Sequence, residues 1–180
     1  MTIADAQRDV RTTFLGGFAG QFVSGLVWLA SAALATWASP RAAILMLVFG
    51  GVLIFPLTQL TLRLMGRPAA LPKGHPMNAL AIEIAFIVPL CLPLIGAATL
   101  HHLYWFYPAF MIVVGAHYLP FAFLYGMRQF LALGVLLIAA GLLIGLYLPS
   151  SFSLGAWIAA ALLFVFAFTG RSVAAAQQPA

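Results

Sequence analysis

The sequence predicts an all-α fold, a polytopic transmembrane helical bundle of six spans with the N- and C-termini in the cytoplasm. Three observations predict it. The chain of 180 residues is 64% hydrophobic and only 6% charged, whereas soluble domains carry about 25% charged residues. Its apolar residues gather in six runs close to the ~20 residues that cross the hydrocarbon core of a bilayer. Its Lys and Arg residues fall almost entirely on one side once these runs alternate across a membrane.

The first three spans are separated by breaks rich in proline, glycine or polar residues. The first span, 14–38, is followed by "SPR", and the second, 42–65, is followed by "GRPAALPKGHP". Proline and glycine in such number mark a loop, and this is the only break long enough to form one. The third span, 77–100, follows that loop and ends before the pair "HH".

The last three spans are divided by even shorter breaks. Only Arg128 separates the fourth span, 103–127, from the fifth, 129–148, and the sixth, 154–170, follows "PSSFS". The end of the chain, "VAAAQQPA", is expected to be disordered, as chain termini often are. The predicted domains are a polar N-terminal segment at 1–13, a six-helix transmembrane domain at 14–170 and a disordered tail at 171–180.

The basic residues set the expected orientation, because cytoplasmic loops are enriched in Lys and Arg. Alternating sides along the six spans leaves Arg41 alone on one side. The other side, which holds both termini, carries Arg8, Arg11, Arg63, Arg67, Lys73, Arg128 and Arg171. We therefore expect a multi-pass protein of the cell inner (plasma) membrane.

The first span has an alternative interpretation as a cleaved signal peptide, because Arg8 and Arg11 precede an apolar run and "SAALATWA" offers small residues for cleavage. A signal peptide has an apolar core of about 7–15 residues. The apolar run at 14–35 is longer and contains Gln21. We therefore expect an uncleaved first span.

Several classes of site are not expected. Eight basic residues are scattered without a basic run, so the net charge of +5 fits membrane topology better than nucleic-acid binding. The single Cys91 excludes an intramolecular disulfide and a cysteine zinc cage. The histidines form no HxxxH or HExxH motif, and no phosphate, flavin or nicotinamide fingerprint occurs. We expect no metal, no cofactor and no nucleic-acid partner.

The polar residues inside the spans share one half of the membrane. Counted from the cytoplasmic end at ~1.5 Å per residue, Gln21 lies about 10 Å deep, Gln59 roughly 6–9 Å and Glu83 about 9 Å. His117 lies about 15 Å deep, and Tyr125 lies close to the cytoplasmic surface. This shared depth predicts a cytoplasm-facing polar pocket, lined by Glu83, His117, Gln21 and Gln59 and bordered by Tyr118 and Tyr125.

Glu83 is the only acidic residue outside the N-terminal segment. An unpaired carboxylate in hydrocarbon is costly, so it must be protonated, paired or hydrated. One hypothesis makes it the protonatable centre of an ion or solute site. The other makes it a structural group that pairs with another helix, for example through Arg63.

His117 lies beside Pro120, which removes a backbone donor and is expected to kink the fourth span. A kink frees carbonyl groups, and His117 and Tyr118 could satisfy them. We favour this structural interpretation over a proton relay, because a lone histidine in a membrane span is more often structural.

The stretches "FGGVLIFPLTQL" and "VVGAHYLPFAFLYG" resemble small six-helix bacterial inner-membrane proteins of unassigned function. The resemblance covers the second to fifth spans and implies a six-helix α-fold without an activity. Size and span count are also similar to those of the vitamin-binding subunits of energy-coupling-factor transporters, by analogy and without a diagnostic motif.

Transport-related function is therefore the main hypothesis, with a small solute or ion as the ligand. The first alternative is a structural or assembly subunit of a membrane complex without its own transport activity. The second alternative is a small intramembrane enzyme using Glu83 and His117, which is less expected because no other acid–base pair is available. The expected partners are the lipid bilayer, a small-molecule or ion ligand and further copies of the chain in a homo-oligomer.

Overall fold

The computed structural model describes residues 1–148 and 151–176, and within this part the regular structure is entirely helical. Six helices are long and apolar enough to cross a membrane, which confirms the prediction of an all-α protein with six spans. The chain is therefore built as a multi-pass membrane protein. The six spans are Leu15–Trp37, Pro40–Leu64, Asn78–His101, Leu103–Tyr125, Gln129–Tyr147 and Leu154–Ala176.

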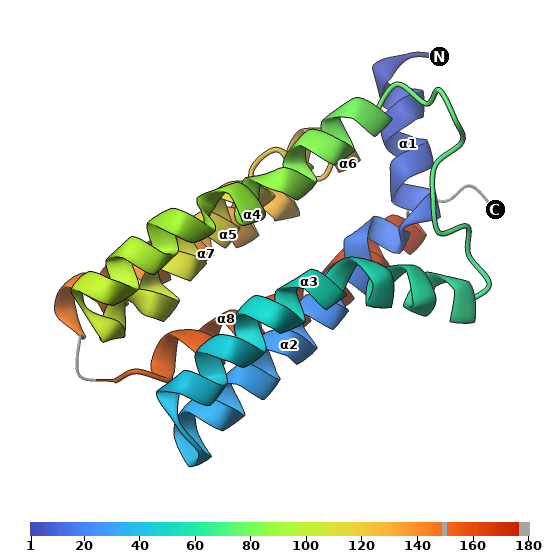
Figure 1. The fold of residues 1–180 in the computed structure, drawn as a ribbon. Coiled ribbons are helices and arrows are strands. Elements are labelled where there is room, and N and C mark those ends of the chain that lie inside the picture. Colours follow the sequence, from blue (N-terminus) through green and yellow to red (C-terminus); the bar gives the residue numbers. More distant parts are fainter. Residues whose placement is uncertain (149–150, 177–180) are drawn as a thin grey trace.

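The elements follow the predicted breaks closely, with a short helix before the first span and a broken fourth span (Figure 1). Their bounds are α1 Ile3–Thr13, η1 Leu15–Gly17, α2 Phe18–Trp37, α3 Pro40–Leu64, α4 Asn78–His101, η2 Leu103–Trp105, α5 Phe106–Tyr118, α6 Phe121–Tyr125, α7 Gln129–Tyr147 and α8 Leu154–Ala176.

Two layers of three helices form the bundle. In the first layer α2 packs between α3 and α8, and in the second α5 packs between α4 and α7. The layers are joined along one side, where α8 contacts α7 and α5. Along the other side α3 and α4 are separated from each other (Figure 1). The N-terminus and the end of α8 lie at one end of the bundle, called the termini end below, and the opposite end is called the far end.

Short-range signals in the sequence explain where helices begin. The side chain of Thr2 accepts a hydrogen bond from the backbone N–H of Asp5, and the Asp5 carboxylate accepts one from Thr2 in return, which is a capping box. At the start of α3 the Ser39 hydroxyl accepts from the Ala42 N–H at 3.2 Å, and Pro40 takes the first helical position.

Glycines allow the closest contacts between helices. A Cβ added to Gly115 of α5 would lie 2.7 Å from the carbonyl oxygen of Gly134 in α7, and a Cβ on Gly134 would lie 2.7 Å from the carbonyl of Gly115. Both distances are shorter than real contacts, so α5 and α7 can approach this closely only with glycine at both positions. This pair holds the second layer together.

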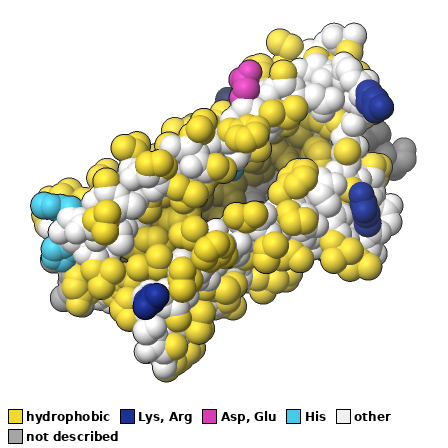
Figure 2. Space-filling model, in the orientation of Figure 1, with side chains coloured by type: hydrophobic (Ala, Val, Ile, Leu, Met, Phe, Trp, Pro, Cys, Tyr) yellow, Lys and Arg dark blue, Asp and Glu magenta, His cyan; other side chains and the backbone are white. Residues whose placement is uncertain are grey.

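Hydrophobic side chains cover the middle of the face drawn in Figure 2, and Lys and Arg side chains lie near its ends. The distribution matches a bilayer around the middle of the bundle and water at both ends.

Two features differ from the sequence predictions. α8 continues to Ala176, so residues 171–176 are helical where we expected a disordered tail, because Ala174 packs against Gly16 and extends the helix contact. The prediction for residues 177–180 lies outside the described residues. Pro120 does not bend one helix but separates α5 from α6, since the helix ends at Tyr118 and starts again at Phe121.

Candidate functional site

A stripe along α2 faces the second layer and carries the candidate site. Its members are three or four residues apart, which places them on one face of the helix. The stripe consists of Gly17, Gln21, Ser24, Trp28 and Ser31, all of them buried.

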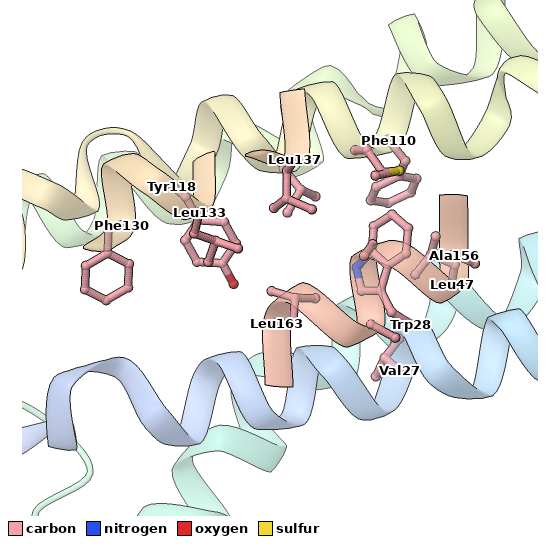
Figure 3. Close-up of a cluster of buried hydrophobic side chains, with 14 of the residues drawn as sticks. Val27, Trp28, Leu47, Phe110, Tyr118, Phe130, Leu133, Leu137, Ala156 and Leu163 are labelled. Atoms are coloured by element: carbon pink, nitrogen blue, oxygen red, sulfur yellow. The ribbon is translucent and has the colours of Figure 1, made fainter. Parts of the chain in front are cut away.

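Towards the far end the stripe is fully packed and hydrogen-bonded. The Ser31 hydroxyl lies 2.6 Å from the Tyr107 hydroxyl of α5 and 2.8 Å from the carbonyl oxygen of Ala43 in α3. Beside them Trp28 packs against Phe110, with ring centroids 5.5 Å apart and the planes nearly perpendicular (Figure 3). These contacts tie α2, α3 and α5 together and leave no room for a ligand.

Towards the termini end the partners of the stripe are tyrosines. The Tyr118 hydroxyl points into the space between the layers (Figure 3), where it lies beside the Ser24 hydroxyl. The phenol of Tyr125 on α6 lies close to that of Tyr118. The Tyr125 ring lies tilted against Phe130, with centroids 4.7 Å apart, and a Cβ added to Gly17 would lie 2.8 Å from the Phe130 ring and 3.7 Å from the Tyr125 ring.

Gln21 lies on the stripe between Gly17 and Ser24, and therefore between the levels of Tyr125 and Tyr118. Its side chain is 2% exposed. Within the described part of the chain neither its Nε2 nor its Oε1 has a hydrogen-bond partner. A buried amide without partners costs about 1–3 kcal/mol, so native proteins rarely leave one without water or a ligand. Gln21 is therefore a buried side chain of the stripe whose hydrogen-bonding groups the described residues leave unpaired.

Three other buried polar groups lie towards the termini end and also lack a hydrogen-bond partner among the described residues. They are the Thr58 hydroxyl of α3, the side-chain amide of Gln129 in α7 and Nε2 of His75 in the loop between α3 and α4. A Cβ added to Gly20, next to Gln21, would lie 3.9 Å from Thr58, so α3 contributes to this region. The termini half of the bundle thus concentrates unsatisfied polar groups, whereas Ser31 and Tyr107 are satisfied.

The helix α1 closes the termini end of this region by binding α6. Gln7 Nε2 donates to the carbonyl oxygen of Phe123 at 2.6 Å, and Arg11 Nη1 donates to that of Tyr125 at 2.7 Å. These carbonyls belong to the last turn of α6, where that of Phe123 also accepts from the Gly126 N–H at 3.2 Å. A Cβ on Gly126, which has φ +62°, would lie 2.6 Å from Gln7 Oε1 and 2.8 Å from Arg11 Nη1, so only glycine fits here.

A second contact connects α1 to the loop between α3 and α4. His75 Nε2 lies 3.6 Å from Asp9 Oδ2, and His75 Nδ1 accepts a hydrogen bond from the Met77 N–H at 3.2 Å. The His75 side chain is 2% exposed and that of Asp9 is 49% exposed. We call the contacts of Gln7, Arg11 and Asp9 the α1 clamp.

His117 lies apart from the Gln21 region and bridges α5 to α4. Its Nδ1 donates to the carbonyl oxygen of Ile84 at 2.9 Å, since a carbonyl can only accept. We expected it to satisfy carbonyls freed near Pro120. Instead the Ala116 carbonyl accepts from the Leu119 N–H at 3.2 Å, and His117 supports the packing of α4.

Glu83 is separated from the other predicted site residues. Its side chain is exposed, and within the described residues it makes no ion pair. At ~100° per residue it points almost opposite to Leu92, which faces α3. Gln59 is half-buried on α3, about 20° around the helix from Val48, which faces α4. The structure thus brings together Gln21, Tyr118 and Tyr125 and leaves Glu83 on the outer surface.

Several residues of the region were not predicted as site residues. Ser24 is one of them, and Gln129 was noted only as the start of the fifth span. Thr58 and the α1 clamp carried no signal of their own, because their role depends on which helices meet. The motif that could have been used is the repeated Ser/Gln spacing on α2, opposite the tyrosines of the fourth span.

Comparisons with known proteins give a family without an activity. No curated protein and no solved structure matches the chain. One family model, described as a family of unknown function (DUF7010), matches residues 3–171, which is nearly the whole chain. The chain belongs to the DUF7010 family.

Proposed function

We propose that the protein is a transport-related membrane protein that binds a small, uncharged, hydrogen-bonding solute at Gln21, between the two helix layers. The observation that carries the proposal is the buried Gln21 amide, which has neither a donor nor an acceptor partner among the described residues. Polar groups inside membrane proteins are otherwise expected to pair or to line a hydrated cavity.

The chemistry of the region favours a neutral solute. The polar groups at neighbouring levels of the stripe, α5 and α6 are hydroxyls, from Ser24, Tyr118 and Tyr125. An amide and hydroxyls can donate and accept hydrogen bonds but do not compensate a full charge. Glu83, which we expected at the centre of the site, is exposed on α4 instead.

We further propose that the termini face the cytoplasm of the inner membrane, since seven of the eight basic residues lie at the termini end. The α1 clamp then closes the site on its cytoplasmic side. Leu119 and Pro120 separate α5 from α6 without a continuous helix. Release of α1 would free α6 to move at this break and open the way to Gln21, as lids do in other proteins.

Thiol accessibility tests this proposal. In a Cys91→Ser background, Gln21→Cys is labelled in oriented vesicles with a membrane-impermeant maleimide. We expect slow labelling from the cytoplasmic side, and faster labelling when Arg11→Ala or Gln7→Ala removes a clamp contact. Arg8→Ala is the matched control, because Arg8 is an exposed basic residue of the same helix.

Absence of labelling from either side in every folded variant would show that the polar groups are sealed within the bundle. The transport proposal would then fail. Equal acceleration of labelling by Arg8→Ala and Arg11→Ala would contradict the role of the clamp, because of these two arginines Arg11 is the one that bonds α6.

One observation favours a second candidate function, that of a subunit in a membrane complex. Glu83 is exposed on a membrane-spanning helix, where a carboxylate gains from a basic or hydrogen-bonding group on another protein. A photoreactive amino acid at position 83 distinguishes the two. A discrete protein adduct would support the subunit function, and lipid adducts alone would contradict it.

An enzyme using Glu83 with His117 is not supported, because His117 donates to Ile84 while Glu83 points outward.

A further inference from the structure

The open side between α3 and α4 contains a cavity of about 280 Å³ near the far end. We call it the α3–α4 groove. Figure 2 shows that the side chains on this open side of the bundle are mainly hydrophobic. The walls used in the argument are Ile44 and Val48 of α3 and Leu92, Ile95, Gly96 and Thr99 of α4.

The side chains in the walls of the groove offer no free hydrogen-bond donor and, as an acceptor, only the hydroxyl oxygen of Thr99. All of the side chains named above are apolar except Thr99. The Thr99 hydroxyl donates to the carbonyl of Ile95 in its own helix at 2.7 Å. A water molecule needs two to four polar partners to be stable in a cavity, and this groove does not provide them. Its occupant must therefore be apolar.

The depth of the groove identifies the medium that reaches it. Ile44 and Val48 lie about 6 and 12 Å from the start of α3 at Pro40. These depths fall within the half of a ~30 Å hydrocarbon core nearest the far end. The groove is continuous with the outer surfaces of α3 and α4, where Phe49 is 65% and Leu94 is 69% exposed. Those surfaces form the interface with lipid, so acyl chains lie at the mouth of the groove.

Gly96 gives the groove its depth. A Cβ added at Gly96 would have no neighbour within 4 Å, in contrast to the glycines that allow helix contacts. The missing side chain therefore leaves space instead of serving close packing. We propose that the α3–α4 groove is a binding site for one acyl chain of a phospholipid from the leaflet at the far end. The inference does not depend on the function proposed for Gln21.

Photo-cross-linking tests the site. The protein is placed in nanodiscs of phosphatidylcholine that contains a small fraction with a diazirine at mid-chain, and adducts are mapped by mass spectrometry. We expect adducts on Ile44 and Val48 in clear excess over Phe49 on the lipid-facing side of the same helix. Equal labelling of Val48 and Phe49 would contradict a site, because it would show only the ordinary lipid around the protein.

A pair of variants supplies the sharper comparison. Gly96→Phe fills the groove, whereas Ala97→Phe adds the same ring at the same depth on the exposed side of α4. Gly96→Phe should lower labelling of Val48 to the level seen at Phe49, because the ring takes the space that the acyl chain would fill. Ala97→Phe should leave it unchanged.

A second groove-filling variant protects the test against misfolding. Thr99→Phe projects into the groove one turn away and should give the same loss if Gly96→Phe does not fold. Equal effects of Ala97→Phe and either groove variant would overturn the proposal. A sealed Gln21 together with a labelled groove would contradict the transport function while leaving the lipid site in place.

Discussion

Two pairs of the same residue types on the same two helices differ in the polar group that lies beside them. Ser31 of α2 meets Tyr107 of α5 at 2.6 Å and also bonds Ala43. Ser24 of α2 meets Tyr118 of α5 beside an amide that has no partner in the described chain. The first pair, towards the far end, is a finished hydrogen-bond network of the kind that stabilises a fold. The second pair lies beside the Gln21 amide, whose hydrogen-bonding groups remain unpaired among the described residues, so identical residue types stand in different polar surroundings at the two levels.

Removing the aromatic packing beside the first pair should have the largest effect. Trp28 is 1% exposed and packs on Tyr107 and Phe110. Trp28→Ala should lower the free energy of unfolding by about 3 kcal/mol. This value lies at the lower end of the range for replacing a large buried side chain by alanine, because lipid also solvates the separated helices. Unfolding by denaturing detergent in mixed micelles measures it. The exposed Leu26 provides the control, and a Leu26→Ala loss of similar size would contradict the prediction.

Replacing Gln21, beside the second pair, and Ser31, of the first pair, should change the free energy of unfolding in opposite directions. Gln21→Leu removes an unsatisfied amide and should raise the free energy of unfolding by about 1 kcal/mol, while Ser31→Ala removes satisfied bonds and should lower it by about 1 kcal/mol. The same detergent titration compares them. A loss of stability in Gln21→Leu would mean that the amide has partners within the protein, and the distinction between the two levels would disappear.

Double-mutant cycles compare the two hydroxyl pairs directly. Ser31→Ala with Tyr107→Phe should show a coupling energy of about 1 kcal/mol, whereas Ser24→Ala with Tyr118→Phe should show less than about 0.5 kcal/mol. The first pair is short and enclosed, and the second can exchange partners. Equal coupling energies would argue that both pairs are structural.

The smallest expected effect is a pH dependence in the stability of the first turn of α1, at the termini end. Hydrogen bonds from the Thr2 side chain and backbone, with a further contribution from Arg8, lower the pKa of Asp5. Because the folded pKa is depressed, the capping box stabilises α1 above the unfolded pKa of Asp5 and is lost as the pH falls through the folded value. Hydrogen exchange of the first turn of α1 should therefore accelerate, relative to intrinsic rates, in acid. Exchange around Tyr107 should not change, and Asp5→Asn should remove the pH dependence.

The elements of the fold could be predicted well, because hydrophobic length decides which segments cross a bilayer. Counting along the chain also gives an expected depth for Gln21, Glu83 and His117. Depth does not give the direction in which a side chain points around its helix. Glu83 and Gln21 were therefore placed at one site, although α4 turns Glu83 outward and α2 turns Gln21 inward.

The contacts between helices could not be predicted either, because the sequence does not show which groups two helices bring together. The α1 clamp joins Gln7 and Arg11 to carbonyl groups more than a hundred residues away, and backbone acceptors have no signature in a sequence. Pro120 did predict an irregularity, but whether the helix bends or is interrupted depends on the packing of α6. In a bilayer these choices are made by van der Waals contacts and hydrogen bonds between helices, which hydropathy does not encode.

The layered arrangement has a consequence for biosynthesis. The first layer combines the first, second and last spans, and α2 completes its packing only when Phe164 of α8 settles against Gly25. A nascent chain leaves the ribosome from its N-terminus, so α2 enters the membrane long before that partner exists. Until α8 arrives, one side of α2 faces lipid or the insertion machinery. A chain that stops before residue 154 is therefore expected to enter the membrane and yet be recognised as unfinished and degraded.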